Sequence, residues 1–249
     1  MIQTSLTQSA RALRLSGLLQ SLEVRLQEAR SSNLSHEEFL ELIFQDELLI
    51  RNQRLMERRK KNARFSQIKT LEDFDWEFNP TIPKKQILDL ATAQFIHQSQ
   101  DILFLGPPGT GKSHLAQAIG LAVIRAGFVV LYRSVFDMVR DLLQDENLKG
   151  HSKVLAQYLK PDFLIIDDMG AKTLPPKAGE YLFEIVLRRH ENRSTLMTSN
   201  RPIEDWGKLI GDVPSATAIL DRFLHHAQLI PFKGRSYRLK NHASPKAKA

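Results

Sequence analysis

The sequence predicts an α/β domain in which helices flank a parallel five-stranded sheet, preceded by a small all-α N-terminal domain. Three observations lead to this prediction. From residue 84 onward, short apolar runs alternate with segments of helical periodicity, which is typical of a parallel sheet covered by helices. A glycine-rich loop, Gly106–Ser113, lies between one such run and one such helix. Residues 1–66 have helical spacing.

The N-terminal domain is expected to contain two helices. The first covers residues 6–29 and would place its apolar residues near one face: Leu6, Ala10, Leu13, Leu18, Leu22 and Leu26. The second begins with a capping box, Ser35 and Glu38, and runs from an acidic start to a basic end, which suits the helix dipole. Residues 67–83, aromatic and interrupted by prolines, are predicted to be a linker.

The second domain is expected to span residues 84–240, with the following elements in chain order. It contains a helix at 84–97, a strand at 101–105, a helix from the glycine loop to Gly127, a strand at 128–133, a helix at 135–146, a strand at 162–167, a helix at 177–191, a strand at 194–199, a helix at 215–226 and a strand at 227–232. Residues 241–249 are rich in Ala, Lys and Pro, and predict a basic disordered tail.

The loop "GPPGTGKS" fits the pattern G-x-x-x-x-G-K-[ST] and has the strand and the helix that the pattern requires on either side. Its backbone N–H groups would cradle phosphate together with the helix N-terminus. Lys112 would reach the β- and γ-phosphates, and the Ser113 hydroxyl would ligate Mg²⁺. The sequence therefore predicts ATP and Mg²⁺ as cofactors, bound by Gly106, Pro107, Pro108, Gly109, Thr110, Gly111, Lys112, Ser113 and His114.

Acidic and amide side chains follow two further predicted strands. "FLIIDD" is a buried strand that ends in Asp167 and Asp168. Asp167 would hold Mg²⁺, and Asp168 would orient or deprotonate the attacking water. Asn200 follows the strand at 194–199 and would point into the same crevice, at the carboxyl ends of the strands.

The net charge of +7 is unevenly distributed. The segment after Phe232 contains six Lys or Arg and no acidic residue, and residues 51–64 contain seven basic residues against Glu57 alone. Two basic regions on an ATP-binding protein indicate an anionic polymer as partner, with a solubilising tail and a solvated helix face as the alternative. The predicted DNA contacts in the second region are Arg51, Arg54, Arg58, Arg59, Lys60, Lys61 and Arg64.

Several classes of protein and site are excluded or disfavoured by composition. The sequence has no apolar stretch that could span a bilayer and no signal-peptide pattern, so we expect a cytoplasmic protein that is not bound to a membrane. Without cysteine there are no disulfides and no thiol catalysis. His225 and His226 are adjacent and would diverge on a helix, so we expect packing or surface histidines there, and no metal site.

Taken together, these motifs resemble the IstB family of AAA+ helper ATPases of insertion-sequence transposition, which is similar to the helicase loader DnaC. The resemblance rests on "GPPGTGKS", "FLIIDD", "TSNRP", the box "AILDRFLHHAQLIPFKGRSYRLK" and the helical N-terminal domain. It implies an ATPase that forms homo-oligomers, as a ring or a helical filament, on duplex DNA and acts with a transposase.

The resemblance also implies roles for individual residues. Arg222 of the "DR" box would act as the arginine finger in a neighbouring subunit's site, with Arg189 as a weaker candidate for an intersubunit contact. Arg133 and Lys153 lie where related ATPases approach DNA. Asp168 replaces the usual Glu, and too few residues follow the last strand for a helical lid domain, so Arg238 would take the sensor-2 role without a lid.

Three alternative functions stay open at this point. One is a replicative helicase loader like DnaC. Another is a small-molecule P-loop kinase, which would leave the basic regions unexplained. The third is an ATP-gated scaffold without meaningful hydrolysis, because Asp168 is one methylene shorter than Glu.

Overall fold

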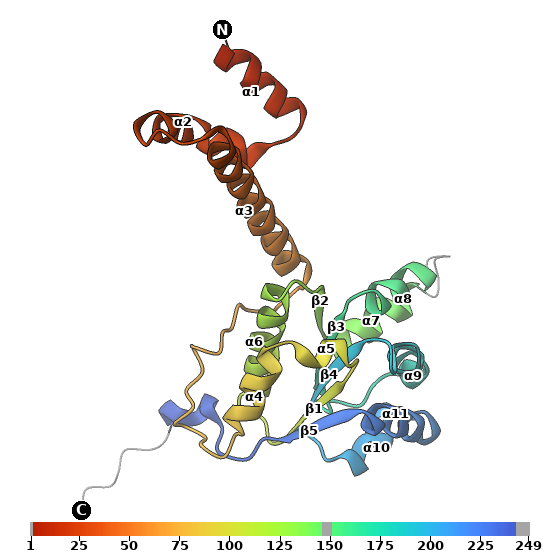
Figure 1. Cartoon of the computed structure of the whole chain (residues 1–249). Coiled ribbons are helices and arrows are strands. Elements are labelled where there is room, and N and C mark those ends of the chain that lie inside the picture. Colours follow the sequence, from red (N-terminus) through yellow and green to blue (C-terminus); the bar gives the residue numbers. More distant parts are fainter. Residues whose placement is uncertain (1, 146–150, 243–249) are drawn as a thin grey trace, which may run out of the picture. The chain divides into compact units, whose positions relative to one another are not determined.

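The computed structural model describes residues 2–145 and 151–242 (Figure 1). The chain folds into two compact units, Met1–Arg58 and Arg59–Ala249. None of the described helices is both long enough and apolar enough to cross a membrane. The predicted tail at 241–249 lies outside the described residues, apart from two residues that belong to the last 3-10 helix.

The first unit contains α1 (Ile2–Ala12), α2 (Ser16–Ser31) and most of α3 (His36–Asn62). Its small core consists of Ala10, Leu18, Leu22 and Ile43. The predicted capping box of α3 is confirmed: the Ser35 N–H donates to Glu38 Oε2 over 2.8 Å, and the Glu38 N–H donates to Ser35 Oγ over 3.2 Å. This exchange satisfies two N–H groups that the first turn of a helix leaves unpaired.

The single helix expected over residues 6–29 is wrong. The chain breaks after Ala12, Arg14 adopts a left-handed φ of 56°, and Leu13 is 68% exposed instead of facing the core. The break frees the first N–H groups of α2, and the buried carboxylate of Glu47 accepts from them, over 2.6 Å at Gly17 and 3.0 Å at Leu18. A distant carboxylate thus supplies the helix cap that the local sequence lacks.

The second unit is built on a parallel five-stranded sheet, as predicted. The strands are β1 (Asp101–Leu105), β2 (Val130–Ser134), β3 (Phe163–Met169), β4 (Ser194–Ser199) and β5 (Ala227–Pro231), in the order β2-β3-β4-β1-β5. Every pair of neighbours is parallel, so the carboxyl ends of β1, β3 and β4 meet at one edge. That edge is where ligands of such sheets bind.

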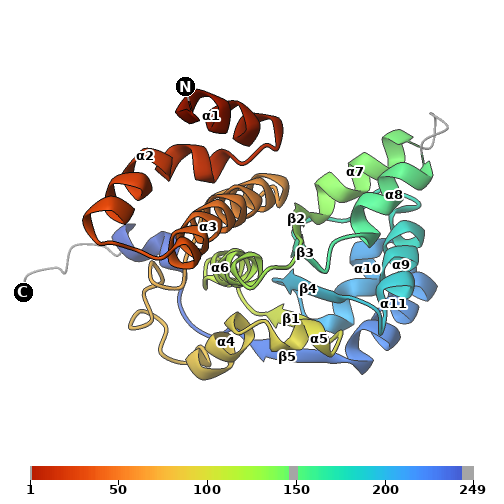
Figure 2. The same ribbon diagram turned by 45° about the horizontal axis from the view of Figure 1, so that its top comes forward.

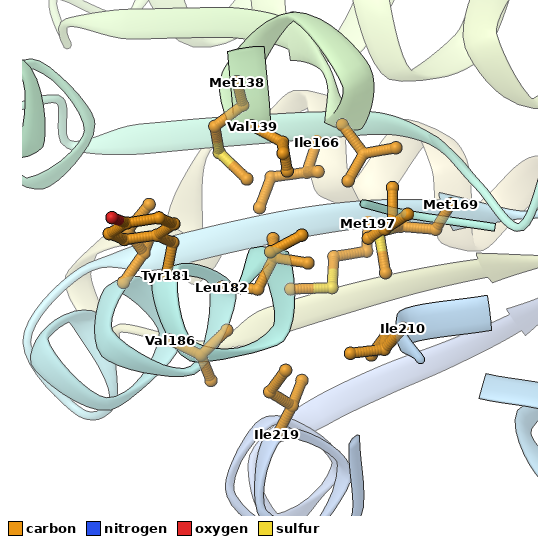
Figure 3. Close-up of a cluster of buried hydrophobic side chains, with 14 of the residues drawn as sticks. Met138, Val139, Ile166, Met169, Tyr181, Leu182, Val186, Met197, Ile210 and Ile219 are labelled. Atoms are coloured by element: carbon orange, nitrogen blue, oxygen red, sulfur yellow. The ribbon is translucent and has the colours of Figure 1, made fainter. Parts of the chain in front are cut away.

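Helices cover both faces of the sheet (Figure 2). One face carries α4 (Lys84–Ala91), α5 (Gln94–His97) and α6 (Lys112–Arg125), and the other carries α7 (Val135–Asp145), α8 (His151–Leu159), α9 (Ala178–Arg189), α10 (Trp206–Ile210) and α11 (Val213–His225). In Figure 3, Met138, Leu182 and Ile219 are among the side chains that pack this second face against β3 and β4. Short 3-10 helices are η1 (Ile203–Asp205) and η2 (Tyr237–His242).

The helices depart from the sequence predictions at three places. The helix expected over 84–97 is two helices, α4 and α5, because Ala93 between them has a left-handed φ of 62°. Neither α8 nor α10 was predicted, and α10, with 5 residues, is too short to show a helical period. After β5, the described residues contain one further element, η2.

Candidate nucleotide-binding site

The glycine-rich loop connects the end of β1 at Leu105 to the start of α6 at Lys112. Its glycines are required for two reasons: a side chain would collide with neighbouring atoms, and the backbone φ is positive. Gly106 and Gly111 have φ values of 157° and 101°, and a Cβ at Gly111 would lie 2.5 Å from Cε2 of Phe74. A Cβ at Gly109, where φ is 78°, would lie 2.1 Å from the Ser236 hydroxyl oxygen. The loop therefore curls in a way that only glycine permits at these positions.

A cleft of about 1040 Å³ opens beside this loop, within the second unit. A volume of this size accommodates a nucleotide. The cleft brings together most of the predicted nucleotide, metal and catalytic residues: Pro108, Gly109, Thr110, Gly111, Lys112, Ser113, His114, Asp167, Asp168, Asn200 and Arg238. Gly106 and Pro107 lie at the start of the loop and contact the side chain of Lys112.

Lys112 folds back onto its own loop. Its ammonium group donates to the carbonyl oxygens of Gly106 and Pro107 over 2.6 and 2.7 Å. Burial lowers the pKa of Lys112 to about 8, although the negative charges of Asp167 and Asp168 oppose that shift. A triphosphate in the cleft would offer this ammonium stronger acceptors than two neutral carbonyls.

Asp167 at the end of β3 is the most heavily bonded group of the cleft. One of its carboxylate oxygens accepts from Ser113 Oγ over 3.0 Å and from the hydroxyl of Thr198, and the other accepts from the hydroxyl of Tyr132. The carboxylate is 1% exposed, and its negative charge together with burial raises the pKa of Tyr132. Sequence reasoning missed both contacts: Tyr132 lies in a predicted strand outside the motifs, and Thr198 begins the motif "TSNRP" but was given no role.

The oxygens of Ser113 and Asp167 fit a magnesium ion. Octahedral coordination with bonds of about 2.1 Å puts adjacent ligand atoms about 3.0 Å apart, which is the separation of Ser113 Oγ and Asp167 Oδ1. Both donors are hard oxygens, the type that Mg²⁺ prefers.

Asp168 has different surroundings from its neighbour. Its φ is 63°, and its N–H donates to Thr198 Oγ1 over 3.1 Å, so the chain turns sharply and the strand pairing between β3 and β4 becomes irregular there. Its carboxyl group lies in the cleft, where partial burial and the charge of Asp167 raise its pKa. A left-handed aspartate costs of order 1–3 kcal/mol and is typical of functional sites.

The segment predicted as a linker, 67–83, forms a wall of the cleft. The Thr70 carbonyl contacts His114 Nε2 over 2.8 Å, and the Phe74 ring lies edge-on to that imidazole. The side chain of Asn79 makes two hydrogen bonds of 3.0 Å to the backbone of Arg235. Its Nδ2 donates to the Arg235 carbonyl, and its Oδ1 accepts from the Arg235 N–H. The C-terminal segment is in turn bonded to the glycine loop, because the Tyr237 N–H donates to the Gly109 carbonyl over 2.8 Å.

The arginines predicted from the resemblance have different surroundings. Arg222 on α11 lies over the ring of Phe183 at 5.8 Å and is not among the residues that line the cleft of its own chain. Arg189 is 1% exposed, and its guanidinium donates to the carbonyls of Tyr158, Pro161 and Ser194. It therefore lacks the surface that an intersubunit contact needs, and its role is to bind chain segments within the fold.

The predicted DNA-contacting residues also divide by their surroundings. Arg133 lines the cleft and is paired with Asp141. In the first unit, Arg51 is paired with Glu47 over 2.5 Å, Arg54 donates to Ser16, and Arg58 is exposed. In the second unit, Lys61 and Lys153 are exposed, Arg59 and Lys60 are half-buried, and Arg64 is exposed and lines the cleft.

Comparison with known proteins gives the family. Residues 8–245 match the family described as IstB-like ATP binding protein. The chain belongs to this family. Its relatives include the protein of insertion sequence IS21 from Pseudomonas aeruginosa, named for ATP binding, with 38% identity over 92% of this chain and 86% of the relative. The corresponding protein of IS5376 from Geobacillus stearothermophilus is 37% identical over 85% of this chain and 84% of the relative.

Solved structures agree on the fold of this IstB-like protein. The DnaC helicase loader is similar with a TM-score of 0.51 and 22% identity, over 60% of this chain and 89% of that one. The replication initiator DnaA bound to AMPPCP and single-stranded DNA has a TM-score of 0.57 and 21% identity, over 74% of this chain and 58% of that one. The second unit thus has the AAA+ fold. The protein is an ATP-binding protein of the insertion-sequence type.

Proposed function

We propose that this IstB-like protein is a Mg²⁺-dependent ATPase that oligomerises on duplex DNA, marks or deforms a target site, and recruits or stimulates a transposase. The observation that supports hydrolysis is the convergence of Lys112, Ser113, Asp167 and Asp168 in one cleft. A bound Mg²⁺ would neutralise charge on the β- and γ-phosphates.

In ATP hydrolysis, the residues of the cleft would have the following roles. Lys112 exchanges its loop carbonyls for phosphate oxygens. Ser113 and Asp167 hold the metal, and Asp167 is kept in place by Tyr132 and Thr198. Asp168 receives the proton of the attacking water or orients that water, and its raised pKa brings it closer to the range of a useful base. Asn200 and Arg238 also line the cleft.

Oligomerisation would complete the site. Arg222 lies outside its own chain's cleft, so an arginine finger from α11 would act in a neighbouring subunit. Assembly would then switch on hydrolysis, because an arginine placed on the transferring phosphoryl group is worth about 10³–10⁵ in rate.

The transposition role is supported by the insertion-sequence relatives and by the basic residues of the chain. DNA would be bound mainly through phosphates, which positions a protein without reading its sequence.

The test compares Lys112→Ala with the exposed control Lys172→Ala in ATP binding, ATP hydrolysis and a transposition assay with the transposase of the same insertion sequence. We expect Lys112→Ala to lose all three by at least tenfold and the control to lose none. Full transposition with Lys112→Ala would contradict the proposal. Activation of a replicative helicase, with no effect on the transposase, would favour the loader alternative.

A further inference from the structure

Three histidines and a glutamate gather at the end of the sheet opposite the nucleotide cleft. His190 and Glu191 follow α9 and precede β4, whereas His225 and His226 end α11 and precede β5. One ligand-type atom from each of the four side chains lies within 4.8 Å of the others. The expectation that His225 and His226 diverge is therefore wrong, because α11 ends at His225 and the two ring centroids are 4.4 Å apart.

We propose that this cluster, His190, Glu191, His225 and His226, binds one transition-metal ion of the Zn²⁺ type. Histidine nitrogens and carboxylate oxygens are both zinc ligands, and these four side chains supply the four protein ligands that a closed tetrahedral site needs. Imidazole favours Zn²⁺, Co²⁺ or Ni²⁺ over Mg²⁺ or Ca²⁺, which need oxygen ligands.

The spacing supports tetrahedral coordination. Metal–ligand bonds of about 2.0–2.1 Å at tetrahedral angles put ligand atoms about 3.4 Å apart. Glu191 Oε1 lies 2.9 Å from His226 Nε2 and 3.7 Å from His190 Nε2, values on either side of that separation. Side-chain rotation alone can close the remaining distances, because Glu191, His225 and His226 are exposed.

A further observation points to a cation here. His190 and His226 are the C-cap residues of α9 and α11, helices of 12 and 13 residues, so two negative helix-dipole ends meet at the cluster. The guanidinium of Arg189, next to His190 in the chain, is bonded to the backbone carbonyls of Tyr158, Pro161 and Ser194.

A bound ion would join the carboxyl ends of α9 and α11, which pack against each other. Because the four residues precede strands whose opposite ends face the cleft, this site is separate from the Ser113–Asp167 site. The ion would have a structural role and would fix the last turn of α11, the helix that carries Arg222.

The experiment uses the full chain without a histidine tag, after bound metal has been removed with a chelator. Excess Mg²⁺ and ATP are then added so that the nucleotide site is filled. Co²⁺ is titrated and followed by its visible absorption, and Zn²⁺ is then added in competition. We expect one Co²⁺ per chain with the intense spectrum of tetrahedral coordination, displaced by Zn²⁺, and a melting temperature raised by Zn²⁺.

The variants are His226→Gln and Glu191→Gln, with His97→Gln as the matched control, an exposed histidine outside the cluster. Each cluster variant should weaken binding at least tenfold and lose the tetrahedral spectrum, and the control should bind like the parent chain. Glu191 has a side chain that is 62% exposed, so its replacement leaves the fold intact. The proposal would be overturned by any of three results: an octahedral Co²⁺ spectrum, unchanged affinity in both cluster variants, or loss of binding in Asp167→Asn alone.

Discussion

Asp167 and Asp168 are adjacent in the chain, yet their environments separate them into different roles. Asp167 is buried and accepts three hydroxyl hydrogen bonds, whereas the Asp168 carboxylate accepts no hydrogen bond from the residues that the structure describes and has a raised pKa. The left-handed backbone at Asp168 interrupts the regular strand, and both aspartates line the cleft. A carboxylate held by several hydrogen bonds suits a metal, and one in the same cleft whose pKa is raised suits proton transfer.

The first prediction follows for Asp168. Asp168→Asn should bind ATP with affinity within a few-fold of the parent chain but hydrolyse it about 10²-fold or more slowly, because the amide cannot take up a proton. Single-turnover hydrolysis and nucleotide titration measure the two effects separately. Asp89→Asn, an exposed change on α4, is the matched control. Normal turnover in Asp168→Asn would remove the residue from the reaction.

Asp101 gives a second prediction at the residue scale. It is 3% exposed, and burial raises its pKa to about 7, although the Thr195 N–H bond over 2.7 Å and the charges of Arg189 and His226 oppose the shift. The folded chain therefore keeps this proton up to about pH 7, whereas the unfolded chain loses it near pH 4. The stabilisation is complete below the unfolded pKa and is lost as the pH rises through the folded pKa.

Replacing Asp101 by Asn removes this titration. Between pH 5 and pH 8, the unfolding free energy of the parent chain should fall by roughly 2 to 3 kcal/mol relative to Asp101→Asn. Urea unfolding at several pH values measures the difference, and Asp89→Asn should instead run parallel to the parent chain. A constant difference between parent and Asp101→Asn at all pH values would show that Asp101 is ionised throughout.

At the scale of elements, the local sequence pattern was sufficient to predict a helix or strand when most of its residues are buried. Strand β3 begins with the apolar run 163–166, and α6 is buried on almost every side, so both are visible from residue type alone. The same patterns predict the grouping of Lys112, Ser113 and Asp167, because parallel strands end at one edge.

Local patterns failed where the partner of a segment is far away in sequence. The break between α1 and α2 depends on Glu47, about thirty residues later. Segment 67–83 resembles a linker, but its aromatic and polar side chains pack on residues 233–240 and on the glycine loop. Its three aromatic residues were the available signal, because a solvated linker has no reason to contain them.

The third prediction belongs to α11. If Arg222 completes the site of a neighbour, Arg222→Ala should bind ATP normally and lose the increase in hydrolysis per subunit that comes with protein concentration and DNA. Mixing Arg222→Ala with Lys112→Ala subunits should restore part of the activity, since one supplies an intact cleft and the other the arginine. The control is Arg188→Ala, at an exposed arginine on α9, and it should behave like the parent. Mixed assemblies without any recovery would argue against action between subunits.

At the scale of the whole molecule, the question is whether the basic residues bind DNA or only keep the protein soluble. The basic residues at 51–64 include some that are committed to partners, such as Arg51 with Glu47, and some that are exposed, such as Arg58 and Lys61. Only cations that reach phosphate release counterions, so the salt dependence of DNA binding distinguishes a DNA-binding surface from a solvated one.

The last prediction applies this distinction to Arg58 and Lys61. Replacing both by Gln should lower the magnitude of the slope of log affinity against log salt by about 2 per bound protomer, because each lost phosphate contact removes about 0.9. Binding should weaken equally on all duplex sequences, since phosphate contacts carry no base information. Lys172→Gln combined with Arg188→Gln removes the same charge from elsewhere on the chain and should leave the slope unchanged. Equal slopes for the parent and both double variants would mean that the exposed cations of α3 face solvent, and the phosphate contacts would then have to come from other parts of the chain.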